Sequence, residues 1–230
     1  LTSPTAPSGA GSSRSTGAAS SCCGGSRATS PPVVHLGMSG RIRLADPTDP
    51  RDPHTNVVWS VAGREVRLVD PRTFGFVACL TPHELDAALA GVGADAFTGL
   101  PAADAVADLL AGRRAPIKAL LLDQRLVAGL GNIYADEALH LAGIDPRRPA
   151  GSLEGAEVSA LVAAIGRVLD DALATGGTSL DDLAYLLPDG RAGEYVDRLA
   201  VYGRTGLPCR RCGAPVARAV VAQRSTHWCP

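Results

Sequence analysis

The sequence has few aromatic residues, a single methionine and no long apolar run. Aromatic residues make up 4% of the 230 residues, although 46% are hydrophobic, which is enough for a folded core. No run of eighteen apolar residues is present to span a bilayer, and the start has no charged-then-apolar signal pattern. These absences argue against membrane and secreted classes of protein, so we expect a cytoplasmic protein without a membrane partner.

The chain also lacks a large net charge. The formal net charge is −1 at pH 7, so the total charge does not indicate nucleic-acid binding. The distribution of charge over the chain matters more than its total. Arginine pairs occur at Arg113-Arg114, Arg147-Arg148 and Arg210-Arg211. Taken alone, such pairs are typical of a solvated surface.

Cysteines are few, and their spacing is the most specific local signal. Of six cysteines, Cys22 and Cys23 lie in a low-complexity stretch and Cys79 has no cysteine near it in sequence, which argues against a disulfide framework. The remaining three form a C-x2-C pair followed, after sixteen residues, by a third cysteine; they are Cys209, Cys212 and Cys229. This pattern is three quarters of a C-x2-C…C-x2-C zinc site.

The spacing would put a fourth cysteine two residues after Pro230, so we expect one zinc ion whose fourth ligand is missing from these residues. On paper His227 could complete a Cys3His set, although it lies only two residues before Cys229. A purely structural hairpin with free thiols is the alternative. The residues between the cysteines include hydroxyl side chains and the cation of Arg224 rather than an apolar face. Such groups are suited to a hairpin that binds phosphate.

Composition divides the chain into four parts and predicts an α+β fold. Residues 1–32 contain nine serines and no acidic residue, a composition that cannot offset chain entropy, so we expect disorder there. Strand-like patterns then occupy 33–80, helical patterns occupy 81–205, and 206–230 form the cysteine hairpin. The patterns predict strands at 41–44, 57–61, 65–69 and 74–79, and helices from Thr81 and at 102–110, 116–126, 133–142 and 158–172.

Five ordered motifs together resemble the formamidopyrimidine-DNA glycosylases and their endonuclease VIII-type relatives. The motifs are His35-Leu36-Gly37-Met38-Ser39-Gly40, Asp70-Pro71-Arg72-Thr73-Phe74-Gly75, Leu122-Asp123-Gln124 through Gly129-Leu130-Gly131-Asn132-Ile133-Tyr134, Val201-Tyr202-Gly203-Arg204, and Gln223-Arg224-Ser225-Thr226 with Cys229-Pro230. The resemblance covers about residues 35–230. It implies a partial N-terminal β-sandwich, a helix–two-turns–helix domain and a C-terminal zinc-finger hairpin.

The glycine-rich motif before Asn132 has two interpretations. Alone, Gly129-x-Gly131-Asn132 is a helix C-cap followed by an N-cap. The resemblance makes it the tight turn of the helix–two-turns–helix element, whose amides and Asn132 bind the DNA backbone around a lesion. Helix N-termini and small residues let phosphate approach backbone N–H groups closely.

Without the family resemblance, three further residues would be assigned to the protein core or to its solvated surface. Met38, the only methionine, and Phe74 would normally be buried, and Arg72 would be solvated. In the family, the residues that match Met38, Arg72 and Phe74 enter the duplex when the damaged nucleotide is flipped out. An apolar wedge fills the vacated space, and a guanidinium can hydrogen-bond the orphaned base.

The resemblance also implies roles for three residues in DNA contacts and in the elimination step. His54 and Arg113 match family positions that contact DNA, with arginine in place of a frequent lysine at Arg113. Arg224 matches the finger arginine that grips the phosphates beside the lesion and serves the elimination step. The stretch 176–195 resembles the flexible loop over the flipped base, although a simple surface loop is an alternative.

The sequence departs from the family at its start. The family begins with a proline, whose secondary amine attacks the sugar, and a glutamate directly after it; this chain opens Leu1-Thr2-Ser3-Pro4 and contains no Pro-Glu pair. We interpret the 230 residues as a catalytically incomplete product of an active family, with doubtful stability because first strands of the sandwich are absent.

The resemblance implies a base-excision repair enzyme, a DNA-formamidopyrimidine glycosylase and AP lyase, that removes oxidised purines such as 8-oxoguanine and formamidopyrimidine by base flipping. Its partner would be damaged double-stranded DNA, and we expect a monomer in the bacterial cytoplasm, associated with the nucleoid. One alternative is a non-catalytic, zinc-dependent protein that binds damaged DNA. A weaker alternative is a stand-alone structural zinc protein.

Overall fold

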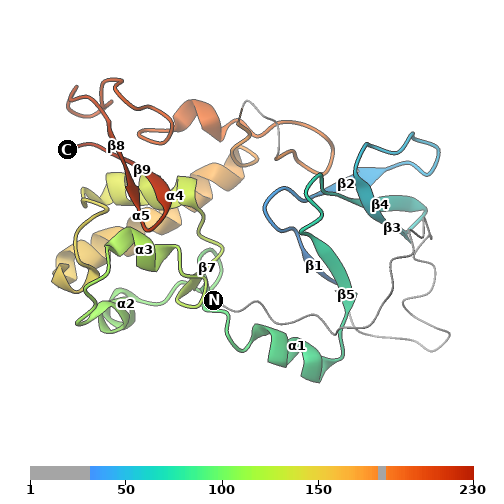
Figure 1. The fold of residues 1–230 in the computed structure, drawn as a ribbon, viewed down its shortest axis with the longest axis horizontal. Helices are drawn as coiled ribbons and strands as arrows, with labels where there is room; N and C mark the ends of the chain where they lie inside the picture. The colour runs from blue at the N-terminus through green and yellow to red at the C-terminus, as the bar shows by residue number, and fades with distance from the viewer. Residues whose placement is uncertain (1–31, 181–184) are drawn as a thin grey trace. The chain divides into compact units, whose positions relative to one another are not determined.

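The computed structural model describes residues 32–180 and 185–230 (Figure 1). The predicted low-complexity segment 1–32 lies outside this range except for Pro32. The chain divides into two compact units, Leu1–Cys79 and Leu80–Pro230, which we describe separately. Strands dominate the described part of the first unit and helices the second, so the predicted α+β class is confirmed.

The first unit contains two antiparallel sheets. Strand β1 (Pro32–His35) pairs with β5 (Phe76–Cys79), and β4 (Arg64–Val69) lies between β2 (Arg41–Ala45) and β3 (Thr55–Val61). The four predicted strands are therefore present. The last begins two residues later than expected, because residues 70–75 form a turn in which Thr73 has a positive φ of 56°.

The hairpin between β3 and β4 has the turn that its sequence predicts. Ala62 and Gly63 have φ angles of 49° and 79°, and two consecutive left-handed residues give the turn type whose twist matches paired strands. The unit's apolar core is small. Among described residues 32–79, the buried hydrophobic side chains are Ala45, Leu68 and Val69.

The second unit is built around α4 (Asn132–Ala142) and α5 (Gly155–Ala174), which pack against each other. The apolar stripe predicted for α5 is buried, except that Val162 is half-buried; the buried members are Val158, Leu161, Ile165, Val168, Leu169 and Ala172. Its other elements before the C-terminal hairpin are α1 (Pro82–Leu89), α2 (Ala103–Leu110), α3 (Ile117–Leu121), the short helices η1 (Ala150–Ser152) and η2 (Tyr195–Arg198), and the two-residue parallel strands β6 (Ala94–Asp95) and β7 (Val127–Ala128).

The helix predicted over 116–126 is shorter in the structure and ends at Leu121. The next residues form a turn, in which the carboxylate of Asp123 accepts hydrogen bonds from the backbone N–H (3.1 Å) and guanidinium (2.9 Å) of Arg125. Such local side-chain bonds offer the backbone an alternative to helix. The turn leads through β7 to α4.

The C-terminal hairpin consists of β8 (Ala217–Val221) and β9 (Arg224–Trp228), and β9 packs against α4. Ala222 and Gln223 form its turn with φ angles of 48° and 63°. Thr226, His227 and Trp228 are buried, whereas Arg224 at the start of β9 is exposed. The hairpin therefore presents Arg224, while the three buried residues Thr226, His227 and Trp228 anchor it to the helices.

Candidate metal centre and nucleic-acid interface

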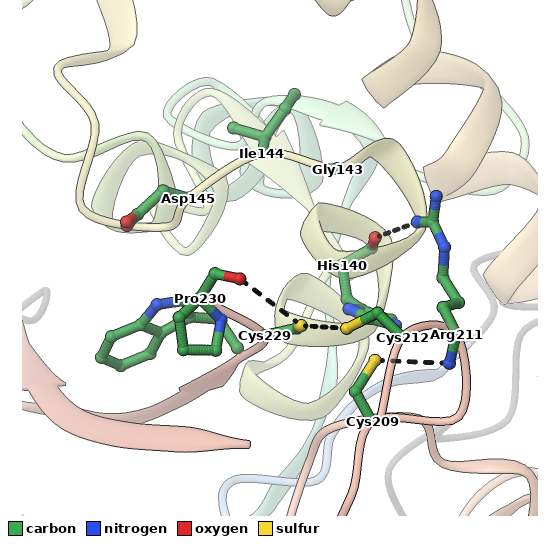
Figure 2. A pocket seen from close by; sticks show the side chains of 10 residues that line it. His140, Gly143, Ile144, Asp145, Cys209, Arg211, Cys212, Cys229 and Pro230 are labelled. Atoms are coloured by element: carbon green, nitrogen blue, oxygen red, sulfur yellow. Dashed lines mark hydrogen bonds between the residues drawn. The ribbon is translucent and has the colours of Figure 1, made fainter. Parts of the chain in front are cut away.

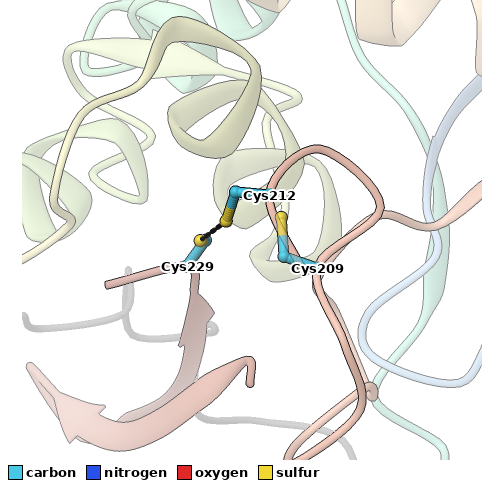
Figure 3. A group of neighbouring side chains, drawn as sticks. All are labelled: Cys209, Cys212 and Cys229. Carbon is cyan, nitrogen blue, oxygen red and sulfur yellow. Dashed lines mark hydrogen bonds between the residues drawn. The ribbon is translucent and has the colours of Figure 1, made fainter. Parts of the chain in front are cut away.

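Three thiols converge at the base of the C-terminal hairpin. Cys209 and Cys212 lie on a tight loop, and Cys229 directly follows β9 (Figure 3). Their sulfur atoms all lie within 4.8 Å of one another, and the Sγ atoms of Cys212 and Cys229 are 3.3 Å apart. Backbone N–H groups of Arg211 and Cys212 lower the pKa of Cys209 to about 7, which favours the thiolate form that binds metal, whereas the neighbouring thiol of Cys212 and burial raise the pKa of Cys229 to about 12.

The cluster fits three corners of a zinc tetrahedron. With Zn–S bonds of about 2.3 Å, tetrahedral sulfur atoms lie about 3.8 Å apart, and the observed spacing needs only small shifts to reach this value. His227 does not join the cluster. Its Nδ1 lies 3.3 Å from Oδ2 of Asp136, and its ring packs against Tyr202 with 4.9 Å between centroids.

A hollow of about 370 Å³ adjoins the thiols (Figure 2). The side chains of His140 and Asp145 also line it. The carboxylate of Asp145 is held by the guanidinium of Arg147 at 2.5 Å, and that guanidinium lies 4.4 Å above the ring of Trp228. The three thiols therefore lie beside the end of α4 and the residues that follow it.

A buried ion pair fastens β9 to the helices. Lys118 on α3 and Asp136 on α4 are both fully buried, with 2.6 Å between Nζ and Oδ1. Lys118 Nζ also donates to the carbonyl of Ser225 (2.8 Å) and to the hydroxyl of Thr226 (2.9 Å). Asp136 accepts from the backbone N–H of His227 at 2.8 Å. Burial lowers the pKa of Lys118 and raises that of Asp136.

The predicted residues Asn132 and Arg224 both lie where β9 meets α3 and α4 at Ser225, a contact that we call the joint. Asn132 is the first residue of α4, and its Nδ2 donates to the carbonyl of Ser225 at 3.1 Å. Ser225 follows Arg224, which is exposed and close enough to lower the pKa of Lys118. The carbonyl of Ser225 therefore joins the start of α4 to the tip of the hairpin.

Gln124 shapes the glycine-rich turn that precedes α4. Its Oε1 accepts from the N–H of Gly129 at 2.8 Å, and its Nε2 donates to the carbonyl of Leu130 at 3.1 Å. Gly129 has φ of 85°, a conformation that favours glycine. Arg113 is also exposed in this unit. The hydrogen bond from Arg125 lowers the pKa of Asp123, and the charge of Arg113 adds a smaller contribution in the same direction.

In the first unit, the predicted residue His54 ends an anchored loop. It is exposed and has a positive φ of 64°. The fully buried guanidinium of Arg67 holds this loop, donating to the carbonyls of Pro50 (2.8 Å) and Asp49 (2.9 Å) and pairing with Glu65 at 2.8 Å. The arrangement keeps the imidazole on the surface.

Met38, Arg72 and Phe74 are all exposed, although a core role is the default for Met38 and Phe74. The exposed fractions are 68% for Met38 and 59% for Phe74.

The sequence analysis did not identify the buried charged residues that hold β9 against the helices, among them Lys118. The sequence does contain an indication of its role, since Lys118 is the only lysine of the chain and stands in an otherwise apolar run.

Three family models match the chain. They are the formamidopyrimidine-DNA glycosylase N-terminal domain at residues 25–77, the formamidopyrimidine-DNA glycosylase H2TH domain at 92–183, and the zinc finger found in FPG and IleRS at 206–230.

Bacterial proteins are similar over most of the chain. The formamidopyrimidine-DNA glycosylase of Moorella thermoacetica is 50% identical over 81% of this chain and 68% of its own length. A crystal structure of the MutM (Fpg) protein from Thermus thermophilus has a TM-score of 0.77 and 44% identity over 86% of this chain and 74% of that one. The Lactococcus lactis Fpg bound to DNA containing an abasic site gives a TM-score of 0.77 and 32% identity over 86% of this chain and 73% of that one.

Proposed function

Because the chain belongs to the formamidopyrimidine-DNA glycosylase family, we propose that it acts in base-excision repair on damaged double-stranded DNA. The family activity carried over is removal of oxidised purines, such as 8-oxoguanine and formamidopyrimidine, followed by strand cleavage at the abasic site. The observation that carries this proposal is the joint at Ser225, where Asn132 and the hairpin that presents Arg224 are fixed together by the Lys118–Asp136 pair. Exposed donors held by buried partners suit a rigid phosphate backbone.

In this proposal, Arg224, Asn132, Arg113 and His54 hold the DNA backbone. Arg224 and Arg113 supply exposed positive charge, and a guanidinium presents a planar fork that matches phosphate oxygens. Asn132 lies at the N-terminus of α4, where backbone N–H groups and the helix dipole favour an anion. Arg224 would also assist the elimination step, as its family counterpart does.

Met38, Arg72 and Phe74 would enter the duplex and fill the space left by the flipped nucleotide. Met38 and Phe74 are both more than half exposed, and Gly37, which precedes Met38, lies against Phe74. An inserted wedge unstacks neighbouring bases and stabilises the extrahelical nucleotide.

The finger would hold one zinc ion through Cys209, Cys212 and Cys229. Bound zinc would fix the loop that carries the first two cysteines against the end of β9, and so hold Arg224 in place. Within these 230 residues, we propose that the fourth position has no protein ligand.

Zinc affinity tests this arrangement. We expect the 230-residue polypeptide to lose zinc readily to a chelator, because three thiolates leave a position that water must fill. Adding two residues after Pro230, the second of them cysteine, is expected to tighten binding strongly. The matched control ends in serine instead. Equal zinc content and chelator resistance in the cysteine and serine extensions would contradict the assignment.

The salt dependence of DNA binding tests the proposed function. Each phosphate contact releases condensed counterions, so Arg224→Ala is expected to weaken binding to all sequences alike and to flatten the slope of log K against log salt by about one unit. The control is Arg167→Ala, which removes the same charge from an exposed position on α5. Fluorescence anisotropy with an abasic-site duplex measures both. An unchanged slope for Arg224→Ala would remove this residue from the phosphate contacts.

In this proposal, a polypeptide of these 230 residues binds DNA but does not carry out covalent catalysis. The family nucleophile is the amine of a proline with a glutamate beside it, and no Pro-Glu pair occurs in the sequence. Such a polypeptide would bind lesion-bearing DNA without forming the Schiff base that leads to strand cleavage.

A further inference from the structure

Asp70 is a buried carboxylate at the end of β4 that has no cationic partner among the ion pairs of the described residues. Its side chain instead accepts three hydrogen bonds: from the hydroxyl of Ser39 (2.5 Å) and the backbone N–H groups of Gly75 (2.7 Å) and Arg72 (3.2 Å). These bonds keep the pKa of Asp70 below its ordinary value. A buried carboxylate without a cation requires such donors to remain charged.

The three donors come from two turns that are far apart in sequence. Ser39 belongs to the turn after β1, which carries Met38 and is closed by a bond from the N–H of Gly40 to the carbonyl of Leu36 at 2.9 Å. Arg72 and Gly75 belong to the turn that carries Phe74. One carboxylate therefore bonds to both turns, at Oδ1 to Ser39 and Arg72 and at Oδ2 to Gly75.

The two turns also touch directly. Gly37 has a positive φ of 63°, and a Cβ placed on it would lie 2.9 Å from Cβ of Phe74. Only glycine fits at this approach without displacing the Phe74 turn. The contact leaves no room for one turn to move toward the other, and the shared carboxylate keeps them from separating.

Backbone bonds at Asp70 already tie the turn to the sheet without its side chain. Its N–H donates to the carbonyl of His54 at 2.9 Å, and its carbonyl accepts from Nδ2 of Asn56 at 2.8 Å. The side chain is therefore free to serve the link between the two turns. Fixing exposed groups before binding lowers the conformational entropy that is lost when they insert into DNA.

We propose that Asp70 is a positioning residue that joins the Met38 turn and the Arg72–Phe74 turn into one rigid wedge for the DNA duplex. This inference rests on the proposed function, in which Met38, Arg72 and Phe74 fill the void left by the flipped nucleotide. It adds that the two turns act together, and that one carboxylate makes them do so.

The variant Asp70→Asn tests the link. The amide keeps the size of the side chain but replaces one acceptor oxygen by an NH2 group. This group cannot accept a hydrogen bond, so either the bond from Gly75 or the bonds from Ser39 and Arg72 are lost. We expect the preference for an abasic-site duplex over an undamaged one to fall about tenfold, while affinity for the undamaged duplex stays unchanged within error. With 2-aminopurine opposite the abasic site, the fluorescence change on binding is expected to shrink.

The control is Asp86→Asn, which makes the same change of charge at an exposed position on α1. Thermal unfolding checks the fold of each variant. Should Asp70→Asn fail to fold, Ser39→Ala decides the question, because it removes only the bond from the Met38 turn and is expected to show the same loss of preference. A folded variant with full lesion preference and full 2-aminopurine signal would overturn the link. Absence of any lesion preference in the unaltered chain would instead overturn the proposed function, and this inference with it.

Discussion

Incubating the 230-residue polypeptide with an 8-oxoguanine duplex and borohydride is expected to give no trapped protein–DNA adduct and no strand cleavage. Trapping requires an amine that attacks C1′ of the sugar and forms an imine, which borohydride then reduces to a stable link. The sequence has one lysine, Lys118. Its Nζ is fully buried and lies 2.6 Å from the carboxylate of Asp136, so it cannot reach a sugar.

Replacing residues 1–32 by the complete N-terminal part of a family enzyme should restore both the adduct and cleavage. This comparison separates a missing nucleophile from a failure to bind, because binding of the abasic-site duplex is measured on both polypeptides. A robust adduct from the unaltered polypeptide would show that another amine serves as nucleophile. Peptide mapping would then identify the attacking amine, for which the α-amine of Leu1 is the candidate, since Lys118 is buried.

The sequence predicts well those features that depend on neighbouring residues. Hydrophobic periodicity placed the buried face of α5, and the Ala62-Gly63 pair placed the hairpin turn. The cysteine spacing likewise predicted the convergence of Cys209, Cys212 and Cys229. Each of these signals lies within a short stretch whose geometry fixes the outcome.

Features that depend on distant residues could not be read from the sequence. Lys118 bonds to Thr226, which is 108 residues away, and Asp70 bonds to Ser39 across 31 residues. No periodicity or spacing reports such pairs. The helix over 116–126 was predicted too long for a different reason: Asp123 bonds locally to Arg125, and this competes with a helical pattern that apolar spacing alone favours.

The second large effect is expected from Lys118→Met, which leaves Asp136 buried without its cation. Breaking a buried ion pair by removing one partner typically costs about 3–5 kcal/mol of the free energy of unfolding. We expect a loss of this order in urea denaturation. Trp228 lies on β9 and is buried, so its fluorescence follows the joint between hairpin and helices; Trp59→Phe, introduced into every protein compared, removes the other tryptophan.

The loss should depend on pH in a direction set by Asp136. Burial already raises the pKa of this carboxyl above its ordinary value of 3.8, and removing Lys118 takes away an interaction that lowers it. A group whose pKa is higher in the folded state binds more protons there, so stability falls as pH rises through that pKa. Lys118→Met should therefore be less destabilised at acid pH than at neutral pH.

A double variant separates the charge from the lost side chain. In Lys118→Met with Asp136→Asn, the amide oxygen can still accept the N–H of His227, but no buried charge is left unpaired. We expect this double variant to recover part of the stability lost in Lys118→Met and to lose its pH dependence. Arg167→Met provides the matched control for removing an exposed cation. A loss in Lys118→Met that is independent of pH and unrelieved by Asp136→Asn would show that packing, and not the ion pair, fastens the hairpin to the helices.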